Sequence, residues 1–302
     1  MAKQALRKIE YGVPTDRCSA TVVLGIEKGF FRDEGLDLTV RVIFGGPELS
    51  AAYDSGGLLF GEIGSPPAIT AISRGSRFVV VGGGLRRGAL MFLGIRSGIR
   101  TWDELRGKRL GVLSIGSCTD WIGRAMLQEH GLVADHDVEI VPLKDDYAKI
   151  LTIVQQGRVD GVVSGEPHLA IGETAGILKV WAAAFEDTLL PRFQWYVLVA
   201  NKSFAESEPA TVGALLRAYG RSSRYALDHL DELVACSSER YDIPQDAARL
   251  AVERELSHLH QGISIDLTGL ERAVELQQRL GAVPTSFRAT HMISSALCAV
   301  DA

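Results

Sequence analysis

The sequence is poor in cysteine, and its cysteines have no spacing typical of a metal site or a disulfide framework. Only four occur in 302 residues, and none forms a CxxC pair. Cys236 and Cys298 lie in helix-like patterns, where a free cysteine packs as a small apolar side chain, whereas Cys18 and Cys118 lie in loops after strands. The seven histidines include no HExxH motif. We therefore expect no metal site and no cofactor.

An excess of positive charge and a long apolar run are also absent. The net charge is −5 and the pI is about 5.8, so we expect no basic surface for nucleic acid. No run of about 18 apolar residues occurs, so we expect no membrane-spanning helix. The first residues, MAKQALRKIEYG, contain no apolar leader. The expected location is cytoplasmic if Met1 is the native start, and periplasmic or cell-surface if a leader has been removed.

What the chain does contain is an alternation of short apolar strands and amphipathic helices. Such alternation favours α/β lobes with mostly parallel sheets, in which ligands bind where strands end and helices begin. From Pro209 onward, apolar residues at helical spacing predict a helical C-terminal tail. The predicted strands are 8–12, 36–44, 60–63, 78–82, 91–96, 110–113, 138–142, 161–164, 180–184 and 195–200, and the predicted helices before the tail include 20–28, 47–55, 66–74, 121–127 and 147–156.

The stretch from 110 to 127 gives the clearest indication of a binding site. An apolar strand, Leu110 to Leu113, ends in a small, hydroxyl-rich loop, and a helix is predicted from Trp121. The first N–H groups of a helix have no intrahelical partner and lie at its positive end, which favours anionic or polar ligands. The alternative is that a hydroxyl of this loop only caps the helix. The candidate ligand-binding residues of the loop are Ser114, Gly116, Ser117, Cys118 and Thr119.

Several segments between residues 8 and 225 carry a family resemblance. In order, they are IEYG, KGFFRDEGLDLTV, GEIGSPPAITAISRG, IRTWDELRGKRLGV and VDGVVSGEPHLA. They resemble the solute-binding proteins of nitrate-, sulfonate- and taurine-type ABC importers, a group that includes binders of thiamine-pyrimidine precursors. The resemblance implies a two-lobed, periplasmic-binding-protein-like fold of type II, with two crossing strands near 88–96 and 195–200. We expect one lobe from 1–91 with 197–302, and an inserted second lobe, 92–196.

The resemblance also implies a function and further site residues. A binding protein of this kind closes over a small organic anion or heterocycle, such as a sulfonate, a carboxylate or a pyrimidine, and delivers it to the permease of an ABC transporter. Arg17 could bind a carboxylate or sulfonate in a bidentate way, and Trp195 could stack on an aromatic ligand. The residues at ligand-contacting positions of the family are Asp16, Arg17, Cys18, Ser65, Pro66, Gly165, Glu166 and Trp195.

An enzyme on the same scaffold is the alternative. The fold has given rise to aromatic sulfinate desulfinases and to pyrimidine synthases, so a cytoplasmic desulfinase-, decarboxylase- or pyrimidine-synthase-like enzyme would use Cys18, or Glu166 with His168. A reactive Cys18 needs a lowered pKa and a base, yet no histidine occurs between Cys18 and Gly61. Glu166 also has a simpler role at the start of a helix, where negative charge is favoured, with His168 on a solvated face. We therefore favour a binding protein.

Overall fold

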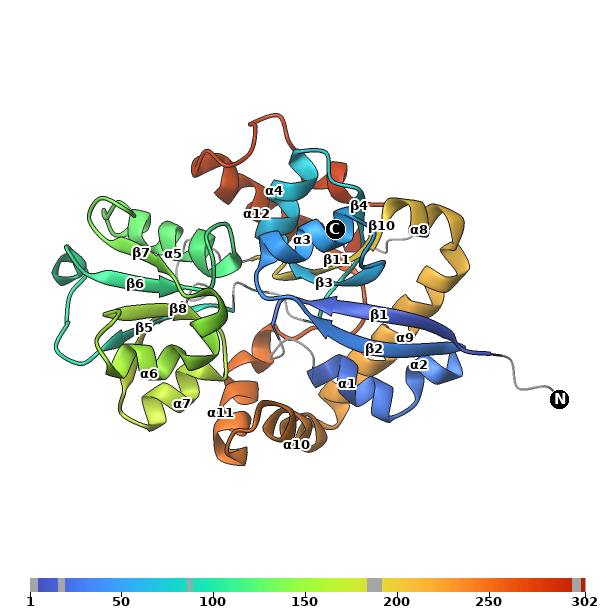
Figure 1. The fold of residues 1–302 in the computed structure, drawn as a ribbon, viewed down its shortest axis with the longest axis horizontal. Coiled ribbons are helices and arrows are strands. Elements are labelled where there is room, and N and C mark those ends of the chain that lie inside the picture. Colours follow the sequence, from blue (N-terminus) through green and yellow to red (C-terminus); the bar gives the residue numbers. More distant parts are fainter. Residues whose placement is uncertain are drawn as a thin grey trace.

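Two five-stranded sheets form the two ends of the molecule (Figure 1). The computed structural model describes residues 5–15, 20–85, 88, 90–183, 192–294 and 300–301. We call the sheet of order β2-β1-β3-β10-β4, with its helices, the first lobe, and that of order β7-β6-β8-β5-β9 the second lobe. The strands are β1 (Arg7–Val13), β2 (Leu36–Val42), β3 (Phe60–Gly64), β4 (Phe78–Gly83), β5 (Phe92–Arg96), β6 (Arg109–Val112), β7 (Glu139–Pro142), β8 (Gly161–Ser164), β9 (Leu178–Ala183) and β10 (Tyr196–Asn201).

Both sheets are mostly parallel, as the sequence predicts, and they share one topology. β1 runs parallel to β2 and β3, and β6 runs parallel to β7 and β8. One strand of each sheet, β10 or β5, runs antiparallel to both of its neighbours. The strands of the second sheet, β5 to β9, follow one another in the chain, whereas the first sheet consists of β1 to β4 and of β10, which comes after the second sheet. This order supports an inserted second lobe, whose boundaries at 92 and 196 stay a prediction.

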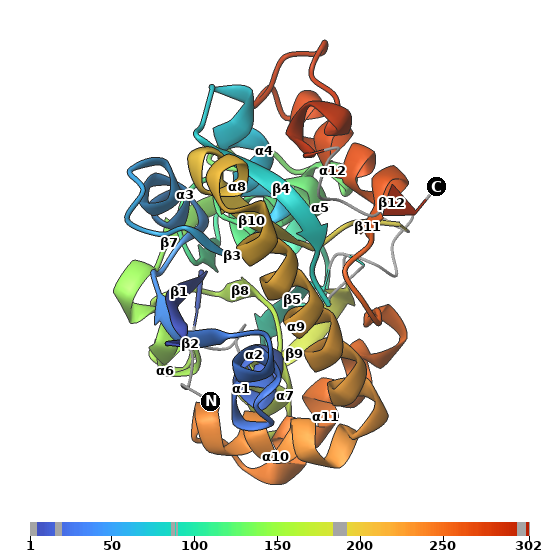
Figure 2. The same cartoon turned by 90° about the vertical axis from the view of Figure 1, so that its right-hand side faces the viewer.

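Helices cover both sheets (Figures 1 and 2). The longest is α9 (Pro209–Asp228), and its buried Val212, Leu215, Leu216 and Tyr219 follow the predicted helical spacing and pack in the core of the first lobe. The first lobe also has α1 (Ala20–Glu27), α2 (Phe30–Asp33), α3 (Gly46–Asp54), α4 (Ser65–Ser73) and α8 (Lys202–Ser207); the second lobe has α5 (Cys118–Glu129), α6 (Ile150–Gln155) and α7 (His168–Thr174), with 3₁₀ turns at Asp103–Leu105 and Lys144–Lys149.

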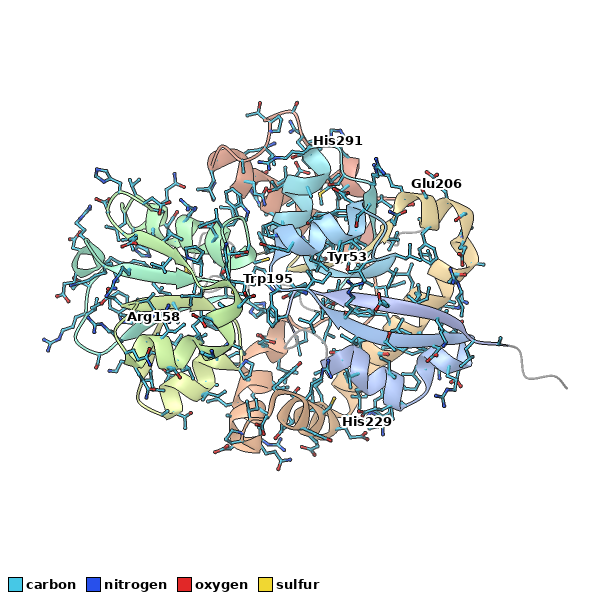
Figure 3. The ribbon with its side chains drawn as sticks, in the orientation of Figure 1. Tyr53, Arg158, Trp195, Glu206, His229 and His291 are labelled. Carbon is cyan, nitrogen blue, oxygen red and sulfur yellow. The ribbon has the colours of Figure 1, made fainter. Side chains whose placement is uncertain are left out.

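The two segments that link the lobes lie side by side. One runs from β4 to β5 and the other from β9 to β10, and within them the Gly88 N–H donates a hydrogen bond of 2.7 Å to the Phe193 carbonyl. Trp195 follows at the centre of the molecule (Figure 3), and its carbonyl accepts from the Ser65 N–H at 2.9 Å. Buried apolar side chains from both sheets meet around Trp195 in one cluster, so the site between the lobes rests on a common core.

The C-terminal tail is helical, as predicted, and contacts both lobes. It contains α10 (Leu230–Tyr241), α11 (Gln245–Glu255) and α12 (Leu267–Arg279), 3₁₀ turns at Leu256–His258 and Ala289–Met292, and a short parallel pair, β11 (Ile265–Asp266) with β12 (Val300–Asp301). We call α10 and α11 the C-terminal hairpin. α10 packs against α1 of the first lobe, and α11 packs against α7 of the second. Among the described residues, no helix has the length and apolarity needed to cross a membrane.

Candidate ligand-binding site

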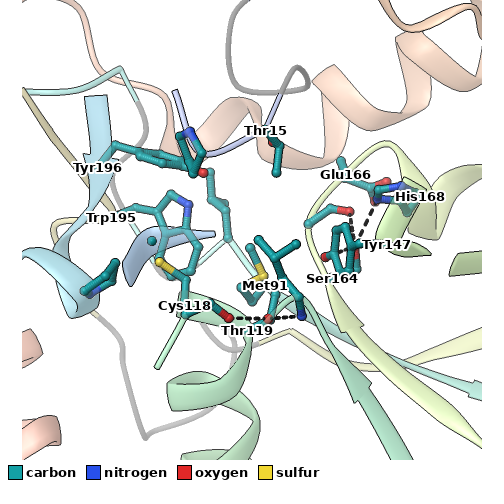
Figure 4. A pocket seen from close by; sticks show the side chains of 18 of the residues that line it. Thr15, Met91, Cys118, Thr119, Tyr147, Ser164, Glu166, His168, Trp195 and Tyr196 are labelled. Atoms are coloured by element: carbon teal, nitrogen blue, oxygen red, sulfur yellow. Dashed lines mark hydrogen bonds between the residues drawn. The ribbon is translucent and has the colours of Figure 1, made fainter. Parts of the chain in front are cut away.

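A cavity with a volume of about 100 Å³ lies between the lobes and takes its walls from both (Figure 4). Because one water molecule needs roughly 10 to 15 Å³ of such space, the cavity has room for a small solute. Phe44 and Thr15 come from the first lobe, Met91 and Tyr147 line it on the side of the second, and the linking segment adds Trp195. A larger groove, of about 1250 Å³, lies outside the cavity between α3, α4 and α5 and is open to solvent.

Six of the residues expected from the sequence line this cavity. They lie where the strand-end rule places a ligand, after β6, after β8 and just before β10. The position of these residues in the wall agrees with a binding role, while direct contact with a ligand stays a prediction. The six residues are Ser117, Cys118, Thr119, Gly165, Glu166 and Trp195.

Four other expected residues are not part of the cavity wall. Ser65 is fully buried, and its hydroxyl donates to the Gln194 carbonyl at 2.6 Å. The Pro66 carbonyl accepts from the side chain of Gln277 on α12. These two residues therefore fix α4 to the linking segment and to the tail, instead of facing the cavity.

The other two, Ser114 and Gly116, lie beside the wall in the loop after β6. The Ser114 side chain is buried, and a side chain on Gly45 of the first lobe would meet its hydroxyl at 3.1 Å. Gly116 lines the outer groove. The remaining candidates, Asp16, Arg17 and Cys18, lie outside the described residues.

Ser117 and Thr119 form a hydroxyl pair at the start of α5. The Leu113 N–H donates to Thr119 Oγ1 at 2.8 Å, and the Ser114 N–H donates to Ser117 Oγ at 3.3 Å. The two hydroxyl oxygens are 2.9 Å apart, so one of the two hydroxyls donates a hydrogen bond to the other. Ser117 precedes the helix without making a side-chain capping hydrogen bond, and both hydroxyls accept instead from the loop after β6. One of their two protons is left to donate, so the pair is suited to an acceptor atom of a ligand.

A second polar cluster in the wall was not predicted from the sequence. Tyr147 Oη lies 2.8 Å from Ser164 Oγ, which lies 3.1 Å from Nδ1 of His168. The expectation that His168 is solvated is wrong: its side chain is buried, and the Tyr147 ring packs edge-on against it. Hydroxyl and imidazole groups both donate and accept hydrogen bonds, so this cluster can adapt to either kind of ligand atom.

Glu166 is a buried carboxyl in the same wall. One of its oxygens accepts from the Ala170 N–H at 2.9 Å, as expected for a carboxyl at the start of α7, and the other pairs with Arg254 of α11 at 2.5 Å. Burial is the main reason that the pKa of Glu166 is raised to about 7, and the neighbouring Glu255 contributes to this increase. The hydrogen bond from the Ala170 N–H and the charge of Arg254 act in the opposite direction. Glu166 therefore titrates near neutral pH.

This raised pKa makes stability depend on pH in a definite direction. Because the folded pKa is above the ordinary value of 4.5 for a glutamate, the folded state binds the proton more tightly, and its stabilisation is lost as the pH rises from about 4.5 to about 7. In Glu166→Gln, which has no such proton, we expect the fall in unfolding free energy between pH 5 and pH 8 to shrink by about 1 to 3 kcal/mol. Denaturant titration at both pH values measures it, and an unchanged slope would contradict the assignment.

Other parts of the wall carry weak sequence signals or none. Tyr196, the neighbour of the predicted Trp195, also lines the cavity. Met91 lies at a predicted crossing strand, which was a usable signal. Glu255 comes from α11, a segment that no local pattern connects with the site. Among the described residues, no group of three or more His, Cys, Asp or Glu side chains is arranged to hold a metal ion.

The architecture defines the class of protein. Two mostly parallel α/β lobes joined by two linking segments, with a cavity between them, form a periplasmic-binding-protein-like fold of type II. A family model described as NMT1/THI5 like matches residues 18–233, and the chain belongs to this family. It is 24% identical over 240 residues to the Bacillus subtilis (strain 168) protein named "Putative binding protein YtlA", covering 78% of this chain and 71% of that protein.

Solved structures have the same fold. The alkanesulfonate-binding protein SsuA from Xanthomonas axonopodis pv. citri, bound to MOPS, aligns over 100% of both chains with a TM-score of 0.77 and 16% identity. The periplasmic nitrate-binding protein NrtA from Synechocystis PCC 6803 aligns with a TM-score of 0.75 and 14% identity, over 93% of this chain and 83% of that one. At these identities the likeness is one of fold, and it confirms the fold expected from the sequence.

Proposed function

We propose that this protein is the substrate-binding protein of an ABC-type importer and holds a small organic solute between its lobes. The observation that carries the proposal is the cavity, whose walls come from both lobes and from the linking segment. A solute that contacts both walls binds the closed arrangement more tightly than an open one, so binding favours closure. The alkanesulfonate- and nitrate-binding proteins of the same fold support a solute-binding role. For an importer role, we expect the protein to lie outside the cytoplasm beside a permease.

Among sulfonate, carboxylate and heterocyclic ligands, the described part of the wall favours a heterocycle. Trp195 and Tyr196 offer aromatic rings for stacking. The hydroxyl pair Ser117–Thr119 donates to an acceptor atom. Glu166 and Glu255 also belong to the wall, and their carboxyl groups disfavour an anionic ligand. A neutral, flat solute with hydrogen-bonding ring atoms satisfies all three features.

The state of Glu166 also favours binding over catalysis. One of its carboxyl oxygens accepts from the Ala170 N–H and the other pairs with Arg254. A general base needs an oxygen in reach of the proton that it removes, and these bonds hold both oxygens within the wall. The enzyme based on Glu166 and His168 is therefore the weaker alternative, and the one based on Cys18 concerns residues outside the described part of the chain.

A solute screen followed by a paired variant tests the proposal. We expect heterocycles, more than aliphatic sulfonates, to raise the melting temperature of the protein. In calorimetric titration with the best solute, Ser117→Ala/Thr119→Ala should weaken binding by about 1 to 3 kcal/mol, because the cavity loses a buried donor. The control is Ser55→Ala, since Ser55 is exposed and bonds only within α3 and its end.

Two results would count against this assignment. Equal affinity in the double variant would remove the hydroxyl pair from the site. If no solute of either class shifts the melting temperature, and native mass spectrometry after incubation with a cell extract finds none bound, the binding-protein proposal itself is wrong.

A further inference from the structure

The C-terminal hairpin is a second physical connection between the lobes, separate from the two linking segments. On the side of the first lobe, the Ala20 N–H of α1 donates to Tyr241 Oη at 3.0 Å, and Lys28 pairs with Glu232 at 2.5 Å. The side chains of Leu24 and Leu233 belong to a buried apolar cluster between α1 and α10. Helix α10 is therefore fixed to the first lobe by both polar and apolar contacts.

On the side of the second lobe, the connection converges on Arg254 of α11. Its guanidinium pairs with Glu166 at 2.5 Å and with Glu173 of α7 at 2.9 Å, and it lies over the ring of Phe92 of β5, 5.7 Å from the ring centre. All three partners belong to the second lobe. The Glu166 side chain is only 2% exposed and that of Arg254 is 21% exposed, so this ion pair is largely shielded from solvent.

We propose that Arg254 is a positioning residue of the cavity: it fixes Glu166 to the C-terminal hairpin, so that the hairpin holds the two lobes together around the ligand. The next residue, Glu255, is itself part of the cavity wall, so α11 cannot move without changing the site. The connection between the lobes follows from these contacts and does not depend on the proposed function. Only the expected effect of this connection on ligand affinity rests on the proposed function.

The physical reason is the cost of a buried charge. Without Arg254, the Glu166 carboxylate must take up a proton or move toward water, because an unpaired buried charge is strongly unfavourable. Among the described residues, the charged and titratable groups around Glu166 are Arg254 and Glu255 on α11, Tyr241 on α10, and His168 and Glu173 on α7. Arg254 is the cation among them that pairs with Glu166, so its removal should loosen the hairpin from the second lobe, and more so at high pH.

Cys118 provides a reporter that needs no ligand. Its side chain is partly buried, and its sulfur packs on the backbone of Gly64, 2.0 Å from where a side-chain carbon on Gly64 would lie. Separation of the lobes therefore exposes it further. Cys236 provides the matched control within the hairpin. It is buried between α10 and α1, and burial raises the pKa of its thiol to about 11, so its reaction rate rises only if α10 unfolds or separates from α1. Peptide mass mapping after iodoacetamide treatment follows the two residues separately.

The experiment compares Arg254→Met and Arg254→Lys with Arg272→Met, which removes an exposed ion pair with Glu275 on α12. We expect Arg254→Met to raise the alkylation rate of Cys118 about fivefold, Arg254→Lys to raise it less, and Arg272→Met to leave it unchanged. The ratio of the Arg254→Met rate to the wild-type rate should grow from pH 6 to pH 9, because only the ionised Glu166 needs a cation. The thiol's own ionisation cancels in this ratio.

Three outcomes would overturn the proposal. They are an unchanged Cys118 rate in Arg254→Met, an equal increase in Arg272→Met, and a parallel increase at Cys236, which would mean that α10 unfolds or leaves α1 instead of α11 releasing the second lobe. None of these measurements uses a ligand, so a failed solute screen would reject the proposed function and leave this result standing.

Discussion

Replacing Gly61 by alanine should cost the protein about 3 kcal/mol or more of its unfolding free energy. Gly61 lies on β3 beside Gly12 of β1, and a side-chain carbon there would lie 2.3 Å from the carbonyl oxygen of Gly12 and 2.6 Å from its nitrogen. Both of these atoms are backbone, and β1 is also held by its pairing with β2. The clash therefore cannot be relieved by rotating a side chain, and chemical denaturation measures the loss.

Gly213→Ala is the matched control. Gly213 lies inside α9, and the nearest atom to an added side-chain carbon is the flexible end of Arg217, at 3.3 Å. Alanine is a better helix former than glycine, so we expect this variant to gain about 0.5 to 1 kcal/mol. Opposite signs for the two variants would support close contact of β1 and β3, and a harmless Gly61→Ala would contradict it.

The same pair of glycines shows how far the sequence determines the fold. The predicted strands 8–12 and 60–63 match β1 and β3, because apolar runs and their boundaries are local properties. That Gly12 and Gly61 face each other is a property of strand order, which no local pattern contains. The place of β10 inside the first sheet was expected only from the family resemblance, since local patterns cannot tell which sheet a returning strand joins.

The residues of the site likewise fall into two groups: those with a local signal in the sequence, and those whose position depends on contacts with distant residues. Ser117 and Thr119 were predicted from a local rule, because a strand that ends in a hydroxyl-rich loop before a helix places those groups at the cavity. The solvated His168 was a wrong prediction, because its burial depends on Tyr147, which is distant in sequence and packs against it. Glu255 was missed for the same kind of reason, since α11 packs on α7, which is distant in sequence. Ser65 was expected in the site, yet its hydroxyl bonds to the Gln194 carbonyl and is not part of the cavity wall.

Trp195→Ala should have the largest effect on the cavity itself. Its side chain is only 1% exposed, and its ring lies 6.0 Å from that of Phe193 and 5.9 Å from that of Tyr196, measured between ring centres. Removing a buried aromatic side chain of this size costs about 3 to 5 kcal/mol, from lost burial and from the space left behind. Denaturant titration measures the loss, and Trp195→Phe, which keeps an aromatic ring, should lose less.

Addition of indole separates loss of the ring from general disruption of the protein. An apolar space left by a deleted side chain binds a small aromatic molecule of matching shape, so free indole should raise the melting temperature of Trp195→Ala more than that of the wild type. Trp121→Ala is the control, because Trp121 is only partly buried and its Nε1 donates to the Gly116 carbonyl at 3.0 Å near the outer groove. If indole stabilises both variants equally, Trp195 does not fill a shaped space in the wall, and its proposed role in stacking on a ligand loses its structural basis.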